Sequence, residues 1–195
     1  MTRDDTRRLI QQTALELFTE QGYERTSLRE IAERLGVTKA ALYYHFKAKE
    51  DILAALFQEW RGPVDEVIEW ARAAPPCPAA KEQALRRYER ALVRASPLLR
   101  LFQANWAAMR GLDVGAEFRD TMRRVVGLFT DSEASLSDQL RCSVAVMTLH
   151  ASVIAMDDIE AEPAQKRAAA LEIALDLLAA TTAPPGHRSL PAGPA

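Results

Sequence analysis

The sequence predicts an all-α protein with two helical domains. Apolar residues recur at helical spacing along most of the chain, and no segment shows the strict alternation of a half-buried strand. The 195 residues are enough for a small domain and a larger one, each with its own core. We therefore expect a three-helix domain over residues 1–47, a larger helical domain over residues 48–183, and a disordered Pro- and Gly-rich tail over residues 184–195.

Residues 26–49, TSLREIAERLGVTKAALYYHFKAK, are expected to form two short helices joined by a tight turn. Ser27 and Glu30 make a capping box, in which each satisfies a free backbone donor at a helix start. Gly36 can adopt the left-handed conformation that ends this helix, and Thr38 is a favourable N-cap for the next one. The second helix is very short and carries polar and aromatic side chains. This arrangement is typical of the helix-turn-helix that reads the DNA major groove.

Further helices are expected on both sides of this segment. The first covers about residues 6–21 and stops at Gly22. A helix that starts near Ala48 must bend or break at Gly62-Pro63, because proline cannot donate the backbone hydrogen bond and clashes with the preceding turn. After a Pro-rich loop, the remaining helices are expected at about 79–95, at 97–111 with Ser96 as its cap, at 114–130, from Ser135 or Ser137 to Asp157, and at 163–180.

An ordered run of residues through the first quarter of the chain resembles the TetR-type transcriptional repressors. This resemblance implies a helix-turn-helix DNA-binding domain followed by a helical ligand-binding and dimerisation domain. It also implies a ligand-responsive regulator, most often a repressor, that binds a near-palindromic operator as a homodimer and is released by a small lipophilic or aromatic effector. The matching residues are Ile10, Ala14–Phe18, Gly22-Tyr23, Thr26-Ser27, Ile31-Ala32, Gly36-Val37, Leu42–Phe46 and Lys49–Leu53.

The resemblance also implies which residues meet DNA. Thr26 and Ser27 would present hydroxyls and backbone donors to a phosphate, and residues 38–40 would approach base edges at the start of the reading helix. Packing is the alternative for Tyr44 and for Phe46, and it is preferred for Phe46. For His45, packing and a contact with the DNA backbone both remain open. Ala48 departs from the family, where a capping residue such as Ser is common, so a cap worth roughly 0.5–2 kcal/mol is expected to be missing. The complete expected set is Thr26, Ser27, Arg29, Thr38, Lys39, Ala40, Tyr43, Tyr44, His45, Lys47 and Lys49.

A ligand pocket between the middle helices is the second implication of the resemblance. A ligand wedged among Trp70, Phe102, Trp106 and Met109 would push the helix that contains Gly62-Pro63 and so change the spacing of the reading helices. Plain core packing is the alternative for each aromatic and Met residue, and a satisfied core histidine is the alternative for His150. The expected ligand-binding residues are Trp60, Trp70, Tyr88, Phe102, Asn105, Trp106, Met109, Met147 and His150.

The last two long helices carry apolar stripes that are wider than one intrachain contact needs. Two such helix pairs related by a two-fold axis would form a four-helix bundle, which predicts a homodimer. The expected interface residues are Leu140, Val144, Met147, Ala151, Leu171, Leu175 and Leu178.

The bulk properties constrain the partners and the compartment. The net charge of -2 is not typical of a DNA-binding protein, but residues 25–49 contain six Lys and Arg against two Glu, which gives a local excess of +4. The start of the chain has no apolar signal core, and the longest apolar stretch is too short to span a membrane. Two unmatched cysteines indicate free thiols, so a cytoplasmic location is expected.

Other function classes leave weaker signals. A helical enzyme would need a nucleophile, a base and an orienting group together, and no such set, phosphate-binding loop or metal motif stands out, so no enzyme activity, cofactor or metal is expected. His150 and Asp157, seven residues apart beside other acids, could be read as metal ligands, but a solvated helix end explains them as well. A helical interaction module would not need the Tyr43-Tyr44-His45 face.

Overall fold

A computed structural model describes residues 3–156 and 158–182. Every regular element in these ranges is a helix, so the all-α fold class is confirmed. The tail that was expected to be disordered, and Asp157, lie outside the described residues. The helices are α1 (Arg3–Gln21), α2 (Leu28–Leu35), α3 (Lys39–His45), α4 (Lys49–Ala73), α5 (Pro78–Arg94), α6 (Ser96–Ala104), α7 (Trp106–Met109), α8 (Asp113–Gly127), α9 (Leu136–Ile154) and α10 (Pro163–Thr182).

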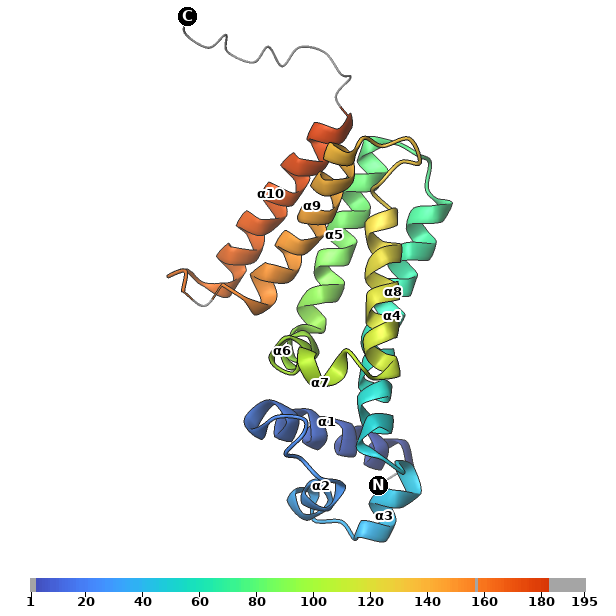
Figure 1. The fold of residues 1–195 in the computed structure, drawn as a ribbon, viewed down its shortest axis with the longest axis vertical. Helices are drawn as coiled ribbons and strands as arrows, with labels where there is room; N and C mark the ends of the chain where they lie inside the picture. The colour runs from blue at the N-terminus through green and yellow to red at the C-terminus, as the bar shows by residue number, and fades with distance from the viewer. Residues whose placement is uncertain (1–2, 157, 183–195) are drawn as a thin grey trace, which may run out of the picture.

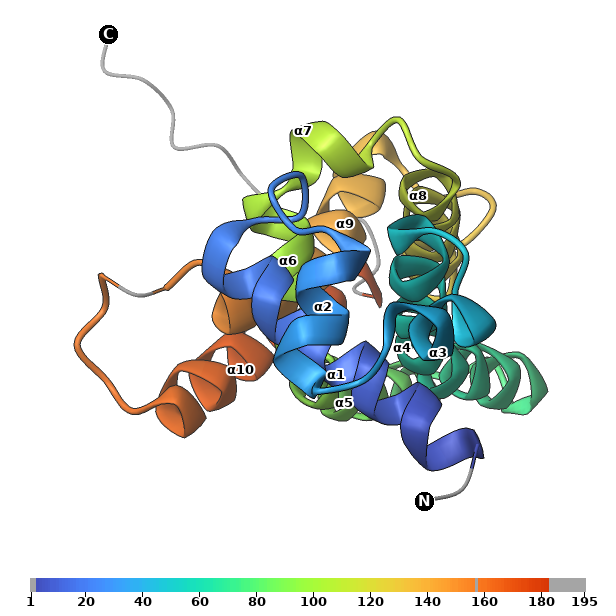
Figure 2. The same cartoon turned by 90° about the horizontal axis from the view of Figure 1, so that it is seen from below.

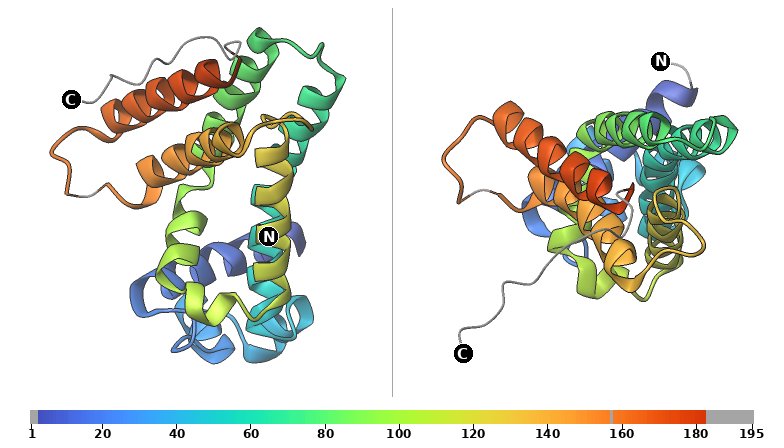
Figure 3. Two further views of the ribbon diagram at one scale, coloured as in Figure 1. Left: turned by 45° about the horizontal axis from the view of Figure 1, so that its top comes forward. Right: turned by 90° about the horizontal axis from the view of Figure 1, so that it is seen from above.

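The helices form a small group at one end and a longer bundle above it (Figure 1). Helices α1 to α3 gather at the lower end, and α4 leads from this group up into the bundle. Seen from below, α1 and α2 lie to one side of α3 and α4, and α10 lies at the edge of the molecule (Figure 2). Helices α9 and α10 run side by side on the flank opposite α4 and α8 (Figure 3). The fold therefore separates the short helices from α9 and α10.

The local signals of the helix-turn-helix are confirmed. The Ser27 N–H donates to the Glu30 carboxylate at 2.8 Å, while the Glu30 N–H donates to the Ser27 hydroxyl at 3.3 Å. Gly36 ends α2 with a φ of 72°, a value that L side chains rarely adopt. The Ala41 N–H donates to the Thr38 hydroxyl at 3.1 Å and so caps α3. Residues next to each other in sequence are sufficient to build these turns.

The helix boundaries differ from the expectation in two informative places. Helix α4 is not broken, because it continues through Gly62-Pro63 to Ala73. Its apolar face is buried both before and after the proline, and this tertiary packing outweighs the lost backbone hydrogen bond. The single helix expected from Ser96 to Gly111 is divided at Asn105 into α6 and α7. Ser96 makes no capping bond, because the N-cap position belongs to Ala95.

Candidate DNA-binding surface and apolar cavity

Helix α3 presents a solvent-facing surface on a buried base. Leu42 and Phe46 are buried and fix the helix against the core of the N-terminal group. Lys39 and Ala40 are exposed at the start of the helix, and Tyr44 is 62% exposed. An exposed tyrosine of this size has no packing role, so the packing alternative for Tyr44 is wrong. The preference for packing of Phe46 is confirmed.

Two arginines of α1 also reach this surface. The Arg3 guanidinium lies 5.1 Å from the centre of the Tyr44 ring, and that of Arg7 lies 4.3 Å from the centre of the Phe46 ring. Arg7 also donates to the His45 carbonyl at 3.4 Å. The sequence-based expectation missed both residues. Their spacing of one helical turn, at the start of a helix that packs on α2 and α4, was the available signal.

Thr26 and Lys49 point inward rather than toward solvent. Thr26 is buried, and its hydroxyl donates to the Gly22 carbonyl at 2.9 Å, so the expected phosphate contact by this hydroxyl is wrong. The Lys49 ammonium donates to the carbonyls of Tyr23 at 2.9 Å and Glu24 at 3.2 Å. It also lies 4.3 Å from the centre of the Tyr23 ring. In this arrangement Lys49 stabilises the turn before α2 instead of projecting its charge toward DNA.

Part of the local positive charge is already paired. Arg29 contacts Glu33 at 2.7 Å and Arg34 contacts Glu20 at 3.0 Å, both on exposed surface. The Lys47 ammonium donates to the Tyr43 carbonyl at 2.7 Å. The positive charge excess of +4 expected for residues 25–49 is therefore reduced at Arg34, which pairs with Glu20 of α1.

The start of α4 is held more firmly than the missing cap at Ala48 suggested. Alanine offers no acceptor, but the Asp51 carboxylate accepts from the backbone N–H groups of Lys47 and Ala48, each at 2.9 Å. The Tyr23 hydroxyl donates to Glu50 at 2.9 Å, and burial raises the pKa of Tyr23. The first turn of α4 is thus fixed to the turn between α1 and α2.

A cavity of about 840 Å³ lies between α6, α7, α8 and α9. Four expected ligand-binding residues line it: Phe102, Trp106, Met147 and His150. The lining is mainly apolar, and among the described residues Arg123, at the exposed rim, is its only charged side chain. The other lining residues, outside the expected set, are Leu99, Gln103, Phe118, Met122, Arg123, Val126, Ser143, Val146, Ala151, Ile154 and Ala155.

Five expected ligand-binding residues lie outside this cavity. Trp60 packs against Phe57 and Phe118. Trp70 lies beneath the Arg87 guanidinium. Tyr88 is fully buried behind His150. Met109 is buried where Gly115 lets α8 approach its carbonyl, and Asn105 bonds to the N-terminal group. Aromatic and Met residues look alike in sequence whether they pack or line a cavity, so only the tertiary structure separates them. Of the four residues among which the ligand was expected, Phe102 and Trp106 line this cavity, whereas Trp70 and Met109 do not.

His150 and Tyr88 form a polar pair at the wall of the cavity. The Tyr88 hydroxyl and His150 Nε2 are 2.7 Å apart, and the same hydroxyl lies 3.6 Å from the Met122 sulfur. Burial lowers the pKa of His150 to about 4 and raises that of Tyr88. The imidazole is therefore neutral at neutral pH. The alternative of a satisfied core histidine holds for Nε2, which is hydrogen-bonded to Tyr88, but not for Nδ1.

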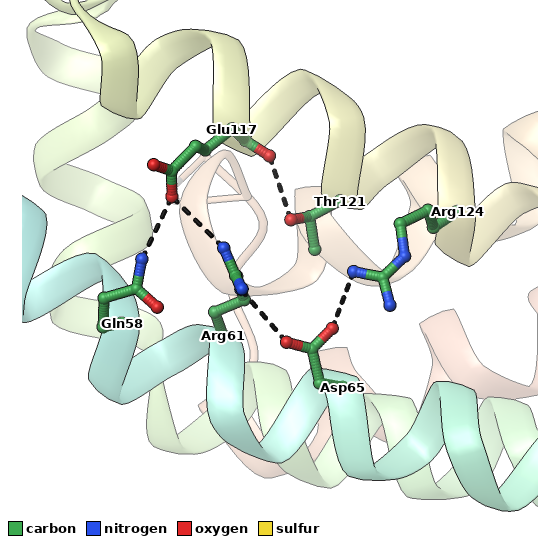
Figure 4. Close-up of polar contacts among 6 residues, drawn as sticks. All are labelled: Gln58, Arg61, Asp65, Glu117, Thr121 and Arg124. Carbon is green, nitrogen blue, oxygen red and sulfur yellow. Dashed lines mark hydrogen bonds and ion pairs between the residues drawn. The ribbon is translucent and has the colours of Figure 1, made fainter.

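Helices α4 and α8 are joined by a polar network that spans Pro63 (Figure 4). Arg61 and Asp65, on either side of the proline, contact each other at 3.0 Å. Arg61 also contacts Glu117 of α8 at 3.3 Å, and Asp65 contacts Arg124 of α8 at 2.7 Å. Because α8 also supplies Phe118 and Met122 to the cavity, the network connects the cavity wall to the middle of α4.

Helix α9 has an apolar face that this chain leaves uncovered. Leu140 is 56% exposed and Met147 is 67% exposed, and Leu136 and Val144 are exposed on the same face. Ile173 of α10 is also exposed. Leu178, in contrast, is 5% exposed and belongs to the intrachain core, so its expected place in a dimer interface is wrong. Leu171 and Leu175 are only partly exposed and pack against that core.

Comparison with known proteins relates this geometry to one family. Residues 10–56 match the model of the bacterial regulatory proteins of the tetR family. The chain is 46% identical over 54 residues to the HTH-type transcriptional regulator AcrR of Shigella flexneri, a match that covers 28% of this chain and 25% of that protein. Residues 10–56 therefore resemble the tetR-family regulators.

The chain is similar to TetR-family proteins in two ways, in sequence over one segment and in fold over most of its length. The tetracycline repressor protein class C of Escherichia coli is 50% identical over 50 residues, which cover 26% of this chain and 23% of that protein. The matches to these curated relatives thus span about a quarter of the relatives' own length. The crystal structure of AmtR from Mycobacterium smegmatis has a TM-score of 0.65 and 25% identity, covering 91% of this chain and 86% of that one. Sequence is shared mainly around the helix-turn-helix, whereas the fold is shared throughout.

No helix in residues 3–156 and 158–182 is long and apolar enough to cross a membrane. The same ranges contain no group of three or more His, Cys, Asp or Glu side chains that could hold a metal ion.

Proposed function

We propose that this protein is a TetR-family, ligand-responsive repressor in the cytoplasm that binds a near-palindromic operator as a homodimer and is released by a small lipophilic or aromatic effector. One observation carries the proposal: a single chain combines an exposed, well-anchored reading helix with an apolar cavity of about 840 Å³. We assign DNA binding to residues 1–47 and ligand binding and dimerisation to residues 48–183.

The DNA-binding part of the proposal rests on the exposed surface of α3. Thr38, Lys39 and Ala40 would approach base edges, where Lys39 can reach guanine acceptors and Ala40 can touch a thymine methyl. Tyr43, Tyr44 and their neighbours would hold the phosphate backbone. These contacts are completed by Ser27, Arg29, His45 and Lys47 of the expected set, and by Arg3 and Arg7, which the structure adds.

The homodimer is supported by the uncovered apolar face of α9. Leu136, Leu140, Val144 and Met147 recur along one side of the helix, and Ile173 of α10 adds to the exposed apolar surface. An exposed patch of this kind on a helical protein is typical of an association surface. Two copies joined here by a two-fold axis would bring two reading helices to one operator, with half-sites roughly 34–36 Å apart.

Coupling between effector and DNA would follow two routes out of the cavity. Helix α8 lines the cavity and is tied to α4 through Asp65 and Arg124. Helices α6 and α7 line it as well, and Asn105 between them bonds to the turn before α2. A ligand that shifts either wall would therefore displace the reading helix. Coupling free energies of this kind are typically about 1–3 kcal/mol, or roughly 5–150-fold in affinity.

Selection from randomised duplex DNA by the purified protein tests the proposal. We expect a near-palindrome with half-sites about one helical turn apart to be enriched. Native mass spectrometry of protein purified without denaturation should reveal a co-purifying small molecule, and adding that molecule should lower operator affinity. Failure to enrich any sequence would overturn the DNA-binding assignment. A copurified molecule that leaves DNA affinity unchanged would overturn the effector role.

A further inference from the structure

The cavity contains one buried polar group whose direction can be deduced. His150 lines the cavity, and its Nε2 is 2.7 Å from the Tyr88 hydroxyl. Its Nδ1 has no hydrogen-bond partner within the described residues. Whether Nδ1 carries a proton therefore decides whether a bound molecule must supply a hydrogen-bond acceptor or a donor at this wall.

The Tyr88 hydroxyl has one proton and two possible acceptors. Imidazole nitrogen is a strong acceptor, whereas the Met122 sulfur, 3.6 Å away, is a weak one. The proton of Tyr88 should therefore point to Nε2 of His150 at the shorter distance. A neutral imidazole that accepts at Nε2 carries its own proton on Nδ1. His150, a lining residue, then has an N–H donor at Nδ1 that no described residue accepts.

The rest of the lining opposes a charged ligand. Within the described part of the chain, Arg123 is the only ionisable lining residue apart from His150, and it is exposed at the rim, where it contacts Asp120 at 2.7 Å. Burial lowers the pKa of His150 to about 4, so this residue supplies no positive charge at neutral pH. Transferring a carboxylate into an apolar cavity without a cation is costly. Phe102, Trp106 and Phe118 instead provide flat surfaces for an aromatic ring.

We propose that the cavity selects an uncharged, predominantly aromatic molecule that accepts one hydrogen bond from His150 Nδ1, and that Tyr88 is the positioning residue that fixes this proton. The inference rests on the proposed effector role of the cavity and names the class of effector. An aromatic ketone, ester or lactone has the required acceptor without a charge.

Three naphthalenes of similar size test the proposal by equilibrium dialysis against the full-length protein. They are 2-acetylnaphthalene, which has a neutral acceptor, 2-isopropylnaphthalene, which has none, and 2-naphthoate, which is charged. The measured quantity is the ratio of ketone to hydrocarbon affinity, because it cancels differences in overall hydrophobicity between protein variants. A neutral hydrogen bond of about 0.5–1.5 kcal/mol corresponds to roughly a twofold to tenfold change in this ratio.

The decisive variants remove the polar pair together or in part. In Tyr88→Phe/His150→Leu both partners become apolar, which leaves no buried group unsatisfied, and the ratio should fall roughly twofold to tenfold. Tyr88→Phe alone should lower the ratio by less, because the imidazole can then adopt either tautomer, while hydrocarbon affinity stays unchanged. Ile68→Val, a conservative change in the buried core outside the lining, should preserve the ratio.

Each alternative result has a distinct meaning. An unchanged ratio in the double variant, or tighter binding of 2-naphthoate than of 2-acetylnaphthalene, would overturn the inference. Binding with the expected ratios but without any effect on operator affinity would support the inference and overturn the effector role. If none of the three compounds binds up to its solubility limit, both proposals fail.

Discussion

Asn105 joins the break between α6 and α7 to the N-terminal helices through Tyr23. Its Oδ1 accepts a hydrogen bond from the Tyr23 backbone N–H at 3.1 Å, while its Nδ2 donates to the Leu101 carbonyl at 3.0 Å. Tyr23 in turn donates from its hydroxyl to Glu50 at the start of α4. The neighbouring residues Gln103 and Trp106 line the cavity, so a single side chain connects the cavity wall to the turn before α2.

We expect Asn105→Ala to lower the free energy of unfolding by about 1–3 kcal/mol, because the partly buried Tyr23 N–H loses its acceptor. The same variant should reduce the effect of a cavity ligand on operator affinity more than it reduces ligand affinity. Thermal unfolding and fluorescence anisotropy measure the two effects. Gln103→Ala, an exposed neighbour, is the matched control and should change stability by less than about 0.5 kcal/mol. Equal stability of the two variants would show that the Asn105 contact contributes nothing.

Residues of the DNA-binding surface should separate by their salt dependence. Tyr43→Ala should weaken binding to all sequences, whereas Lys39→Ala should change base preference with discrimination of roughly 1–3 kcal/mol. Lys49→Ala should weaken binding by loosening the turn at Tyr23, and so should leave the slope of log affinity against log salt nearly unchanged.

The measurement is operator affinity at several salt concentrations, with circular dichroism as the control for folding. A residue that neutralises a phosphate contributes about 0.9 to the slope for each contact. A drop of that size in Lys49→Ala would return Lys49 to the set of phosphate contacts. Unaltered operator affinity in Tyr43→Ala would argue against the proposed docking of α3.

The proposed dimer should depend on the uncovered face of α9. We expect Leu140→Glu combined with Val144→Glu to give a folded monomer, because both side chains are exposed in the single chain and their replacement leaves its core intact. Light scattering at micromolar concentration reports the mass. Leu9→Glu, a partly exposed leucine on α1, is the control and should remain dimeric. If the double variant is still a dimer, the interface lies elsewhere.

Pro63 should matter more for coupling than for DNA binding without ligand. Pro63→Ala restores a backbone donor inside α4, and we expect a gain in stability of about 1–3 kcal/mol, partly offset by a more flexible unfolded chain. A stiffer α4 should change the ligand-induced loss of operator affinity, measured with 2-acetylnaphthalene as the trial ligand. Asp65→Asn, which weakens the contacts with Arg61 and Arg124, is the companion variant. Unchanged coupling in both variants would exclude the route through α4 and α8.

Stability should fall on acidification because His150 is buried in its neutral form. The pKa of His150 is lowered from 6.5 to about 4, so the unfolded chain binds one more proton between these pH values. Stability from this group is complete well above pH 6.5 and is lost as the pH falls through 4, by roughly 3 kcal/mol in total. Tyr88, the titratable group against which His150 packs, stays protonated throughout because burial raises its pKa.

Urea unfolding of wild type and of Tyr88→Phe/His150→Leu between pH 4 and 7 isolates this contribution, since the carboxylates that titrate over the same range are common to both proteins. The difference in unfolding free energy between the two should shrink or reverse as the pH falls. A difference that is independent of pH would show that His150 is not held neutral by the fold.

The sequence by itself determined the elements whose causes are local. The capping box of Ser27 and Glu30, the left-handed turn at Gly36 and the cap at Thr38 each depend on residues within about four positions of one another. The same holds for the order of the helices, because each buries one apolar face whose spacing is visible in the chain. The position of α3 in the sequence was therefore predicted correctly, and so were most of its exposed residues.

Only the tertiary structure decided which of several similar residues has which role. Trp106 lines the cavity while Trp60 and Trp70 pack elsewhere, although all three are tryptophans on helices. The Lys49 ammonium donates to the Tyr23 carbonyl, across a separation of 26 positions in the sequence. The Asn105 side chain accepts from the Tyr23 N–H, across a separation of 82 positions. Helical periodicity specifies the face on which a residue lies but not the neighbour that this face meets. That neighbour is set by the packing of the whole chain, and with it the shape of the cavity and its connection to the reading helix.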